Sequence, residues 1–251
     1  MQLTVPYGYD DVVPLKKHYK VLMPAGTAPI FCRTMNAIAV GFSEFHGAAH
    51  DYPVVFAGAG AGASFVPVAV LGLANGVNLF VDASGDWDPG FYRPAYVRRY
   101  PFCICKAFDE GDKRGRPIVG VAKAYIDDSG VTLFDAQGSG TAQWQAVERL
   151  LADAESDQDH TAKLAAALAQ LELLEPFSMQ VTEEGKSEVR LAGMFRVNEE
   201  KLAALRPASH KALVTKGFMG RIYAHLHSLD NFPRLYAREK ARRPRSQFLR
   251  R

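Results

Sequence analysis

Residues 92–102 read YRPAYVRRYPF and hold three tyrosines and three arginines. Arginine offers a rigid fork of donors to carboxylates and phosphates, and it stacks on aromatic rings. If the segment is a strand, Tyr96, Arg98 and Tyr100 share one face. One interpretation is therefore a recognition surface for an anionic or aromatic group, made by Trp87, Tyr92, Tyr96, Arg98, Arg99 and Tyr100.

The same residue types also build structural plugs. In this second interpretation the tyrosines pack, while the arginines pair with backbone carbonyls or with acids such as Asp82 and Asp86. The sequence leaves both interpretations open, and the group that lies opposite Arg98 and Arg99 decides between them.

A second set of residues could bind a metal ion. His46 and His50 lie one helical turn apart in FSEFHGAAHDYP, and Asp51 and Glu44 add carboxylates nearby. However, Glu44 lies two residues before His46 and points elsewhere, and no further ligand follows at a diagnostic spacing. We expect surface or capping histidines, with a metal site from His46, His50 and Asp51 as the alternative.

Ser228, Asp230 and either His225 or His227 contain the side chains of a hydrolase nucleophile set. The two histidines are two residues apart, so they do not share a helix face. The sequence lacks the G-x-S-x-G turn that presents a nucleophilic serine. We expect a helix end here rather than a catalytic site.

VVFAGAGAGAS places Gly58, Gly60 and Ala63 at the spacing of a dinucleotide-binding loop, with Asp82 at the position of a ribose-binding acid. That motif needs a helix directly after the glycines. Here the chain continues as a β-branched run interrupted by Pro67, which predicts a strand. The pattern therefore favours a loop between two strands, and we expect no cofactor.

The cysteines are few and odd in number, namely Cys32, Cys103 and Cys105, so they do not make a disulfide framework. Cys103 and Cys105 alternate along a predicted strand and so share a face. We expect structural thiols at all three positions.

These residues need a fold that positions them. Near residue 140 the sequence pattern changes from one typical of strands to one typical of helices. Short β-branched and aromatic runs separated by turn residues fill the first part, with Asn75-Gly76 as the clearest hairpin turn. Afterwards helical spacing predicts helices that begin at Thr141 and Thr161, a hairpin over 177–197, a helix capped by Asn198 and a helical stretch over 210–229. The sequence thus predicts an α+β fold, with a largely antiparallel, β-rich N-terminal half and a helical C-terminal half in one compact domain.

Charge separates the body of the chain from its end. Residues 234–251 carry a net charge of +7, whereas residues 1–233 carry −4. We expect residues 1–233 to form the domain and 234–251 a flexible basic tail that contacts an acidic partner. There is no apolar run of about 18 residues that would span a membrane, and no basic-then-apolar start of a signal peptide, so we expect a cytoplasmic protein.

Several strings of the sequence resemble the SapC family of bacterial proteins. They include AAHDYPVVF, PVAVLGLANGVNLFVDASGDW, YRPAYVRRYPF, LLEPFSMQV, GMFRVNEEKLAAL and IYAHLHSL, in this order. The resemblance implies a protein from a surface-layer locus and a surface-related or nutrient-uptake pathway. It carries over no catalytic residues. A peptide-transport permease shares the family's name, but the missing membrane span excludes that interpretation, and the missing signal sequence leaves only signal-less export to the cell surface.

Together these observations predict a non-catalytic binding or accessory protein whose partner is a peptide, a glycan or a protein. The aromatic and arginine-rich segment would supply the recognition surface, and we do not expect nucleic acid as a partner. Two alternatives stay open: a metal-dependent enzyme that uses His46, His50 and Asp51, and a self-assembling surface-layer component. The oligomeric state does not follow from the sequence.

Overall fold

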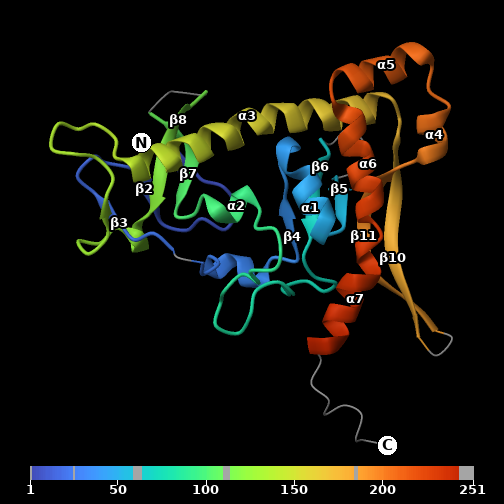
Figure 1. Cartoon of the computed structure of the whole chain (residues 1–251), viewed down its shortest axis with the longest axis horizontal. Coiled ribbons are helices and arrows are strands. Elements are labelled where there is room, and N and C mark those ends of the chain that lie inside the picture. The colour runs from blue at the N-terminus through green and yellow to red at the C-terminus, as the bar shows by residue number, and fades with distance from the viewer. Residues whose placement is uncertain (1, 25, 59–63, 110–113, 184–185, 243–251) are drawn as a thin grey trace, which may run out of the picture.

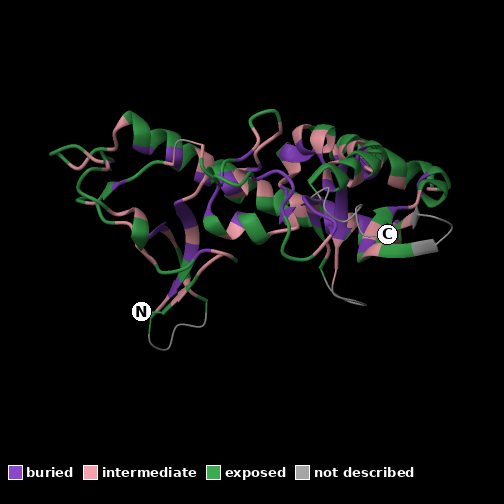
Figure 2. Ribbon diagram, turned by 90° about the horizontal axis from the view of Figure 1, so that it is seen from below, coloured by how far each residue is buried: buried purple, intermediate pink, exposed green. Residues whose placement is uncertain are grey.

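The protein is elongated, and one long helix follows its long axis (Figure 1). The computed structural model describes residues 2–24, 26–58, 64–109, 114–183 and 186–242. Buried residues gather along the interior, while exposed residues cover the outer faces of the helices (Figure 2).

All strand pairs in the described part of the chain are antiparallel, and helices follow in its second half, which confirms the predicted α+β class. A four-stranded sheet has the order β1 (Gln2–Thr4), β7 (Phe102–Phe108), β8 (Arg116–Ala122), β2 (Val12–Pro14). A five-stranded sheet has the order β10 (Leu174–Glu183), β11 (Lys186–Val197), β5 (Val54–Ala57), β6 (Val66–Val70), β4 (Ala37–Ala39). The short strands β3 (Lys20–Val21) and β9 (Val131–Thr132) pair separately.

The helices lie mainly in the second half of the chain. The α-helices are α1 (Phe45–Asp51), α2 (Ala95–Arg98), α3 (Ala142–Gln170), α4 (Glu199–Ala203), α5 (Pro207–Thr215), α6 (Phe218–Ser228) and α7 (Asn231–Arg242). Single 3-10 turns occur at η1 (Ile30–Thr34), η2 (Phe42–Glu44) and η3 (Lys123–Tyr125). The predicted helical stretch over 210–229 is divided at Gly217, whose positive φ of 70° ends α5 and starts α6.

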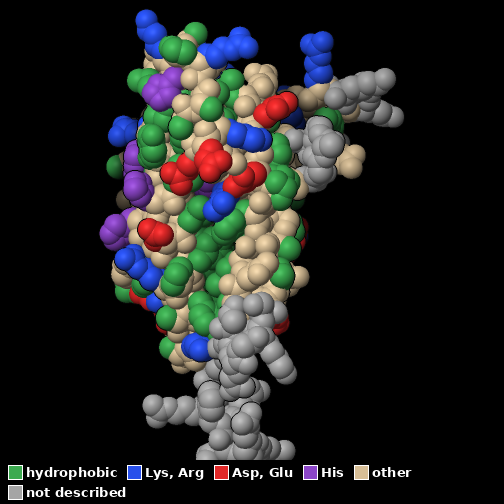
Figure 3. All heavy atoms as spheres, turned by 90° about the vertical axis from the view of Figure 1, so that its right-hand side faces the viewer, with side chains coloured by type: hydrophobic (Ala, Val, Ile, Leu, Met, Phe, Trp, Pro, Cys, Tyr) green, Lys and Arg blue, Asp and Glu red, His purple; other side chains and the backbone are tan. Residues whose placement is uncertain are grey.

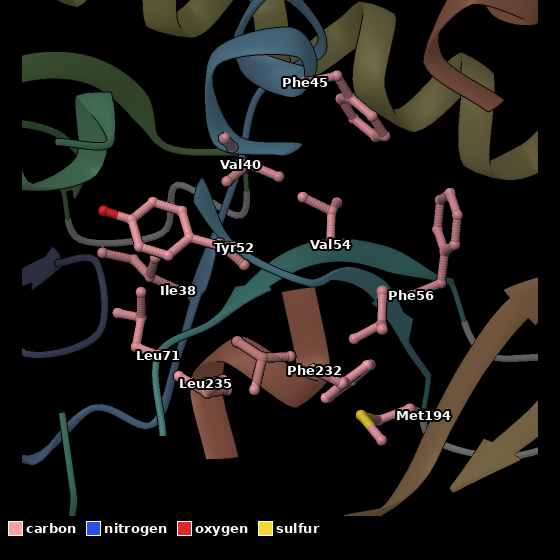
Figure 4. Packing of buried hydrophobic residues seen from close by; sticks show 14 of the residues in the cluster. Ile38, Val40, Phe45, Tyr52, Val54, Phe56, Leu71, Met194, Phe232 and Leu235 are labelled. Atoms are coloured by element: carbon pink, nitrogen blue, oxygen red, sulfur yellow. The ribbon is translucent and has the colours of Figure 1, made fainter. Parts of the chain in front are cut away.

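The largest hydrophobic core surrounds the five-stranded sheet. Figure 4 shows its side chains pointing toward one another from α1, β4, β5, β11 and α7. A second core lies between the four-stranded sheet and the start of α3, and it holds Val21, Phe102, Val121, Leu133, Trp144, Val147 and Leu151.

Helix α3 contributes to both cores, because Leu151 packs in the second core and Leu164 and Leu168 pack in the first. Two separate helices were predicted here, and this prediction is wrong. No proline or glycine interrupts residues 142–170, so the polar residues between the two apolar stretches continue the helix. The predicted cap is confirmed, since Thr141 Oγ1 accepts a hydrogen bond from the Trp144 amide.

The hairpin predicted around Asn75-Gly76 forms only in part. Gly76 has the positive φ of 76° that the turn requires, but residues 78–83 are not a strand. The buried Asn78 donates to the Cys32 carbonyl at 2.8 Å and accepts from the Phe80 amide at 2.8 Å. Its side chain thus bonds to backbone groups that would otherwise be available for the hydrogen bonds between two hairpin strands.

The predicted boundary at residue 233 needs correction. Residues 231–242 form helix α7, which docks on the body, so residues 234–242 do not belong to a flexible tail. Arg238 donates to the Leu79 carbonyl, and Arg242 donates to the carbonyls of Asn78 and Val81. The basic charge of this part therefore holds the segment over 78–88 in place, and residues 243–251 lie outside the described residues.

Candidate functional site

The aromatic and arginine-rich segment is a short helix between two prolines, not a strand. The amides of Val97 and Arg98 donate to the Pro94 carbonyl at 2.9 and 3.0 Å, which forms α2. Pro94 is the N-cap of α2, and its ring fixes a φ of −57° that fits the start of a helix, so the local sequence favours this turn. Tyr96, Arg98 and Tyr100 consequently do not share a strand face as predicted.

Arg99 lies inside a cluster of aromatic rings. Its guanidinium carbon is 4.5 Å from the ring centroid of Tyr96 and 5.8 Å from that of Tyr9. Tyr100 packs on Tyr9 at 5.3 Å and edge-on to Phe31 at 5.7 Å. Burial raises the pKa of Tyr100 to about 12 and raises that of Tyr96. Within the predicted recognition surface, Tyr96, Arg99 and Tyr100 thus pack against other rings of the fold, and cation–π contacts stabilise this packing.

Trp87 is also part of the interior. It is 5% exposed and packs edge-on to the buried Tyr52, with 6.5 Å between the ring centroids. Its indole therefore supports the fold around Tyr52. The predicted role of Trp87 in ligand binding would need the core to open.

Arg98 lies opposite a buried carboxylate. One of its terminal nitrogens is 3.8 Å from Glu44 Oε1 and 3.4 Å from the hydroxyl of Tyr92. The Arg98 side chain is 40% exposed, whereas that of Glu44 is 8% exposed. The acid opposite Arg98 is thus Glu44, and not Asp82 or Asp86.

Glu44, a neighbour of the predicted histidine pair, has a structural role that the sequence did not indicate. Its carboxylate accepts hydrogen bonds from the Tyr92 hydroxyl at 2.9 Å, the Ala95 amide at 2.6 Å and the Gly41 amide at 2.9 Å. Burial, followed by the charge of Glu44, raises the pKa of Tyr92 to about 12. The one local sign of this role is that Glu44 stands at the third position of the η2 turn, where a carboxylate commonly reaches back to the cap amide.

Asp51 forms a second clamp at the other end of α1. Its carboxylate accepts from the Tyr92 amide at 2.6 Å and lies 2.6 Å from His50 Nδ1. Tyr92 is thus held by Asp51 at its backbone and by Glu44 and Arg98 at its hydroxyl. The two acids that flank α1 fix the start of the segment that leads into α2.

His46 and His50 are both exposed on α1, as predicted for surface histidines. Among the residues that the structure describes, no three histidine, cysteine or acidic side chains lie close enough to hold a metal ion. The carboxylate of Asp51 is already engaged by Tyr92 and His50. The geometry therefore does not assemble a metal site from His46, His50 and Asp51.

His225 and Ser228 lie in the core and bind the backbone. His225 Nδ1 lies 2.6 Å from the Val54 carbonyl oxygen, and its Nε2 accepts from the Val197 amide at 3.0 Å. Ser228 Oγ accepts from the Val54 amide at 2.9 Å. Burial lowers the pKa of His225 to about 4. Both side chains connect α6 to the five-stranded sheet, while Asp230 and His227 are exposed.

The glycine-rich segment joins two neighbouring antiparallel strands, β5 and β6, as the loop interpretation predicts. Gly60 and Ala63 lie outside the described residues. Asp82, the predicted ribose ligand, accepts from the Ser84 hydroxyl and from the amides of Gly85 and Asp86, and these hydrogen bonds lower its pKa. It stabilises a turn rather than the end of a strand.

The three cysteines are free and buried. Burial raises the pKa of Cys32 and of Cys103 to about 12 and also raises that of Cys105. Cys103 and Cys105 share a face of β7 and pack over Gly120, where a β-carbon would lie 2.5 Å from Val12 Cγ1 and 3.0 and 3.4 Å from the sulfurs of Cys105 and Cys103. Their environment fits structural thiols.

Comparison with known proteins identifies the family. Over the described residues no helix is long and apolar enough to cross a membrane. No curated protein and no solved structure matches the chain. The family model described as SapC matches residues 15–235, which include the central strands of both sheets and run from α1 into the first part of α7. This match covers most of the 251 residues, and the chain therefore belongs to the SapC family.

Proposed function

We propose that this SapC-family protein is a non-catalytic binding or accessory protein that recognises a peptide or protein partner through a carboxylate. The recognition surface is centred on Arg98 and on the Tyr92 side chain that supports it, and we name it the Arg98 surface. Its link to a surface-layer or nutrient-uptake pathway rests on the family resemblance alone.

The observation that supports this proposal is that the Arg98 guanidinium is partly exposed beside a carboxylate that is already hydrogen-bonded to other groups. Its side chain is 40% exposed, and its nearest carboxylate, Glu44, already accepts hydrogen bonds from Gly41, Tyr92 and Ala95. Arg98 lies 5.8 Å from the Tyr92 ring centroid, which limits the conformations it must lose on binding. An oriented arginine with free donors beside a tyrosine is typical of binding hot spots.

The surroundings favour a partner with its own polar groups. On the backbone side of Tyr92, the His50 side chain is 84% exposed and lies against the Asp51 carboxylate. A partner that covers Tyr92 would therefore meet an arginine on one side and an imidazole on the other. Both groups donate hydrogen bonds to acceptors when protonated.

Affinity purification from a bacterium that carries this chain would test the proposal. Arg98→Ala and Arg98→Glu should reduce the recovery of at least one partner about tenfold or more, with the larger loss for the charge reversal. Arg149→Ala removes an exposed arginine from α3 and serves as the matched control.

The proposal fails if folded Arg98→Ala and Arg98→Glu variants recover every partner at the wild-type level. The self-assembly alternative stays a separate prediction. Light scattering across salt and calcium concentrations would support it only if particles much larger than a dimer form.

A further inference from the structure

A pocket of about 400 Å³ opens beside the second core, away from the segment that carries Arg98. Its walls come from the end of β2, the start of β8, the loop after β9 and the first turn of α3. The residues that matter for its chemistry are Leu15, Lys17, Arg116, Ile118, Phe134 and Trp144. None of these residues is among the site residues predicted from the sequence.

The pocket has a fixed aromatic wall. The rings of Phe134 and Trp144 lie 5.1 Å apart at an angle of 39°, and Trp144 also packs edge-on to Phe102 at 6.3 Å. Trp144 approaches Gly140 so closely that a β-carbon there would lie 2.5 Å from its ring. Since Trp144 is only 7% exposed, this wall is held in place by the core behind it.

Two cations stand at the rim of this apolar wall. Lys17 Nζ donates to the Gly138 carbonyl at 2.9 Å and lies 5.9 Å from the Phe134 ring centroid. Arg116 begins β8 on the other side and is exposed. Neither forms an ion pair within the described part of the chain.

From this arrangement we infer that the pocket binds a small carboxylate with an aromatic or branched apolar body. The lining residues that the structure describes include two cations and no acid, so the field at the rim favours a negative group. The apolar wall would cover the rest of the molecule, as is usual for small-molecule sites of this volume. The body of the ligand would lie against Phe134 and Trp144, and its carboxylate between Lys17 and Arg116.

The charge and the shape each limit the choice of ligand. A neutral apolar molecule would fill the wall but leave both cations unpaired. A small inorganic anion would meet the cations but leave the aromatic wall in water. The combination of both contacts in one ligand is what distinguishes the inferred class.

The chain's two tryptophans make this inference measurable in one experiment. Trp144 lines the pocket, whereas Trp87 belongs to the other core, so a protein labelled with 5-fluorotryptophan reports the site and the fold separately. Titration with 1-naphthoate should shift the fluorine resonance of Trp144 and leave that of Trp87 unchanged. The Trp144→Phe variant assigns the two signals.

The neutral analogue 1-naphthamide tests the role of charge. We expect wild-type protein to bind 1-naphthoate at least about fivefold more tightly than 1-naphthamide. Lys17→Gln and Arg116→Gln should each remove most of this preference while leaving the affinity for 1-naphthamide unchanged. Lys163→Gln removes an exposed lysine at the far end of α3 and should change neither affinity.

Two results would overturn the inference. One is a Trp144 resonance that does not move at millimolar 1-naphthoate; the other is equal affinity of the wild type for the acid and the amide. In the Lys17 and Arg116 variants, an unchanged Trp87 resonance shows that the first core is intact, and wild-type affinity for 1-naphthamide shows that the pocket is intact. The outcome is independent of the Arg98 surface, because no residue of that surface lines the pocket.

Discussion

At the scale of the residue, the buried carboxylate of Glu44 and the buried imidazole of His225 hold this fold together by binding backbone amides and carbonyls. Glu44 joins the η2 turn to the start of α2, and His225 joins α6 to β5 and β11. For His225, burial in addition lowers the pKa of the imidazole. Two predictions follow the chemistry of these groups.

The first concerns Glu44→Gln. The amide keeps the shape of the side chain but loses the charge that the Ala95 amide, the Tyr92 hydroxyl and Arg98 face. Because its NH₂ group would meet donors in a buried place, we expect the free energy of unfolding to fall by about 2–4 kcal/mol. Urea denaturation measures this, with Glu148→Gln on the exposed face of α3 as the control. An unchanged midpoint for Glu44→Gln would contradict the role given to this carboxylate.

The second concerns the pH dependence of stability through His225. Burial lowers its pKa to about 4 in the folded state, while the unfolded chain has an ordinary histidine pKa of about 6.5. The unfolded state thus binds the extra proton first, and stability should fall as the pH drops from about 6.5 toward about 4, by up to about 3 kcal/mol. Above this window His225 makes no such contribution to the slope.

Comparing variants isolates the histidine from the carboxylates that titrate at lower pH. His225→Gln should flatten the dependence of the unfolding free energy on pH between about 5 and 6.5, even though its stability at neutral pH is lower. His210→Gln, an exposed histidine on α5, should keep the wild-type slope. Parallel slopes for wild type and His225→Gln would show that His225 is not neutral in the fold.

At the scale of the element, helix α7 is held by arginines that reach back into the preceding chain. The Arg238 guanidinium carbon lies 4.7 Å from the Phe80 ring centroid and 4.6 Å from that of Phe91. The same side chain donates to the Leu79 carbonyl and pairs with Asp88. The hydrogen bond from Arg238 is the main cause of the lowered pKa of Asp88.

We therefore expect Arg238→Ala to lower the free energy of unfolding by about 2–3 kcal/mol, because it removes two cation–π contacts and a charge-assisted hydrogen bond. Arg238→Lys keeps the charge but not the planar fork, so its loss should be smaller. Thermal denaturation measures both variants. NMR titration should also show the pKa of Asp88 rising toward its ordinary value in Arg238→Ala. Equal stability of Arg238→Ala and wild type would mean that Arg238 does not hold α7 on the body, as expected for the flexible tail that the sequence predicts.

The elements that could be predicted are those whose signals are local. The Thr141 cap, the Asn198 cap and the pairing of β10 with β11 in the hairpin predicted over 177–197 depend on neighbours close in the sequence, and all three are present. Asn198 Oδ1, for example, accepts from the Lys201 amide at 2.8 Å. Hydrophobic spacing likewise indicated which segments turn their apolar side to a core.

The parts that could not be predicted depend on partners far away in the sequence. Asn78 bonds to Cys32, Glu44 to Ala95, and Arg238 to Leu79, and none of these pairings leaves a local pattern. For the candidate site, the sequence indicated the arginine and tyrosine types, but burial sorted them into the stacked Arg99 and the half-exposed Arg98. The pocket lined by Lys17, Arg116 and Trp144 combines three distant segments, so no single motif indicates it.

At the scale of the whole molecule, α3 is the helix that contributes buried side chains to both cores. Its 29 residues span about 43 Å, and its middle part carries mostly exposed polar residues. Asp157 accepts from the Ser43 amide at 2.9 Å, and Thr161 accepts from the Phe42 amide at 2.9 Å, so the helix also fixes the η2 turn next to Glu44. We therefore expect α3 to couple the folding of the two cores.

Breaking α3 between its two buried stretches should separate the cores. In Glu155→Pro, an exposed residue becomes one that removes a helix hydrogen bond and clashes with the preceding turn, at a cost of about 3 kcal/mol. Fluorine NMR during urea denaturation follows Trp144 in one core and Trp87 in the other. In wild type and in the Glu155→Ala control we expect both signals to change at the same urea concentration.

In Glu155→Pro we expect the Trp144 signal to change at a lower urea concentration than the Trp87 signal, since the second core is the smaller one. Coincident midpoints in the proline variant would mean that contacts other than α3 couple the cores.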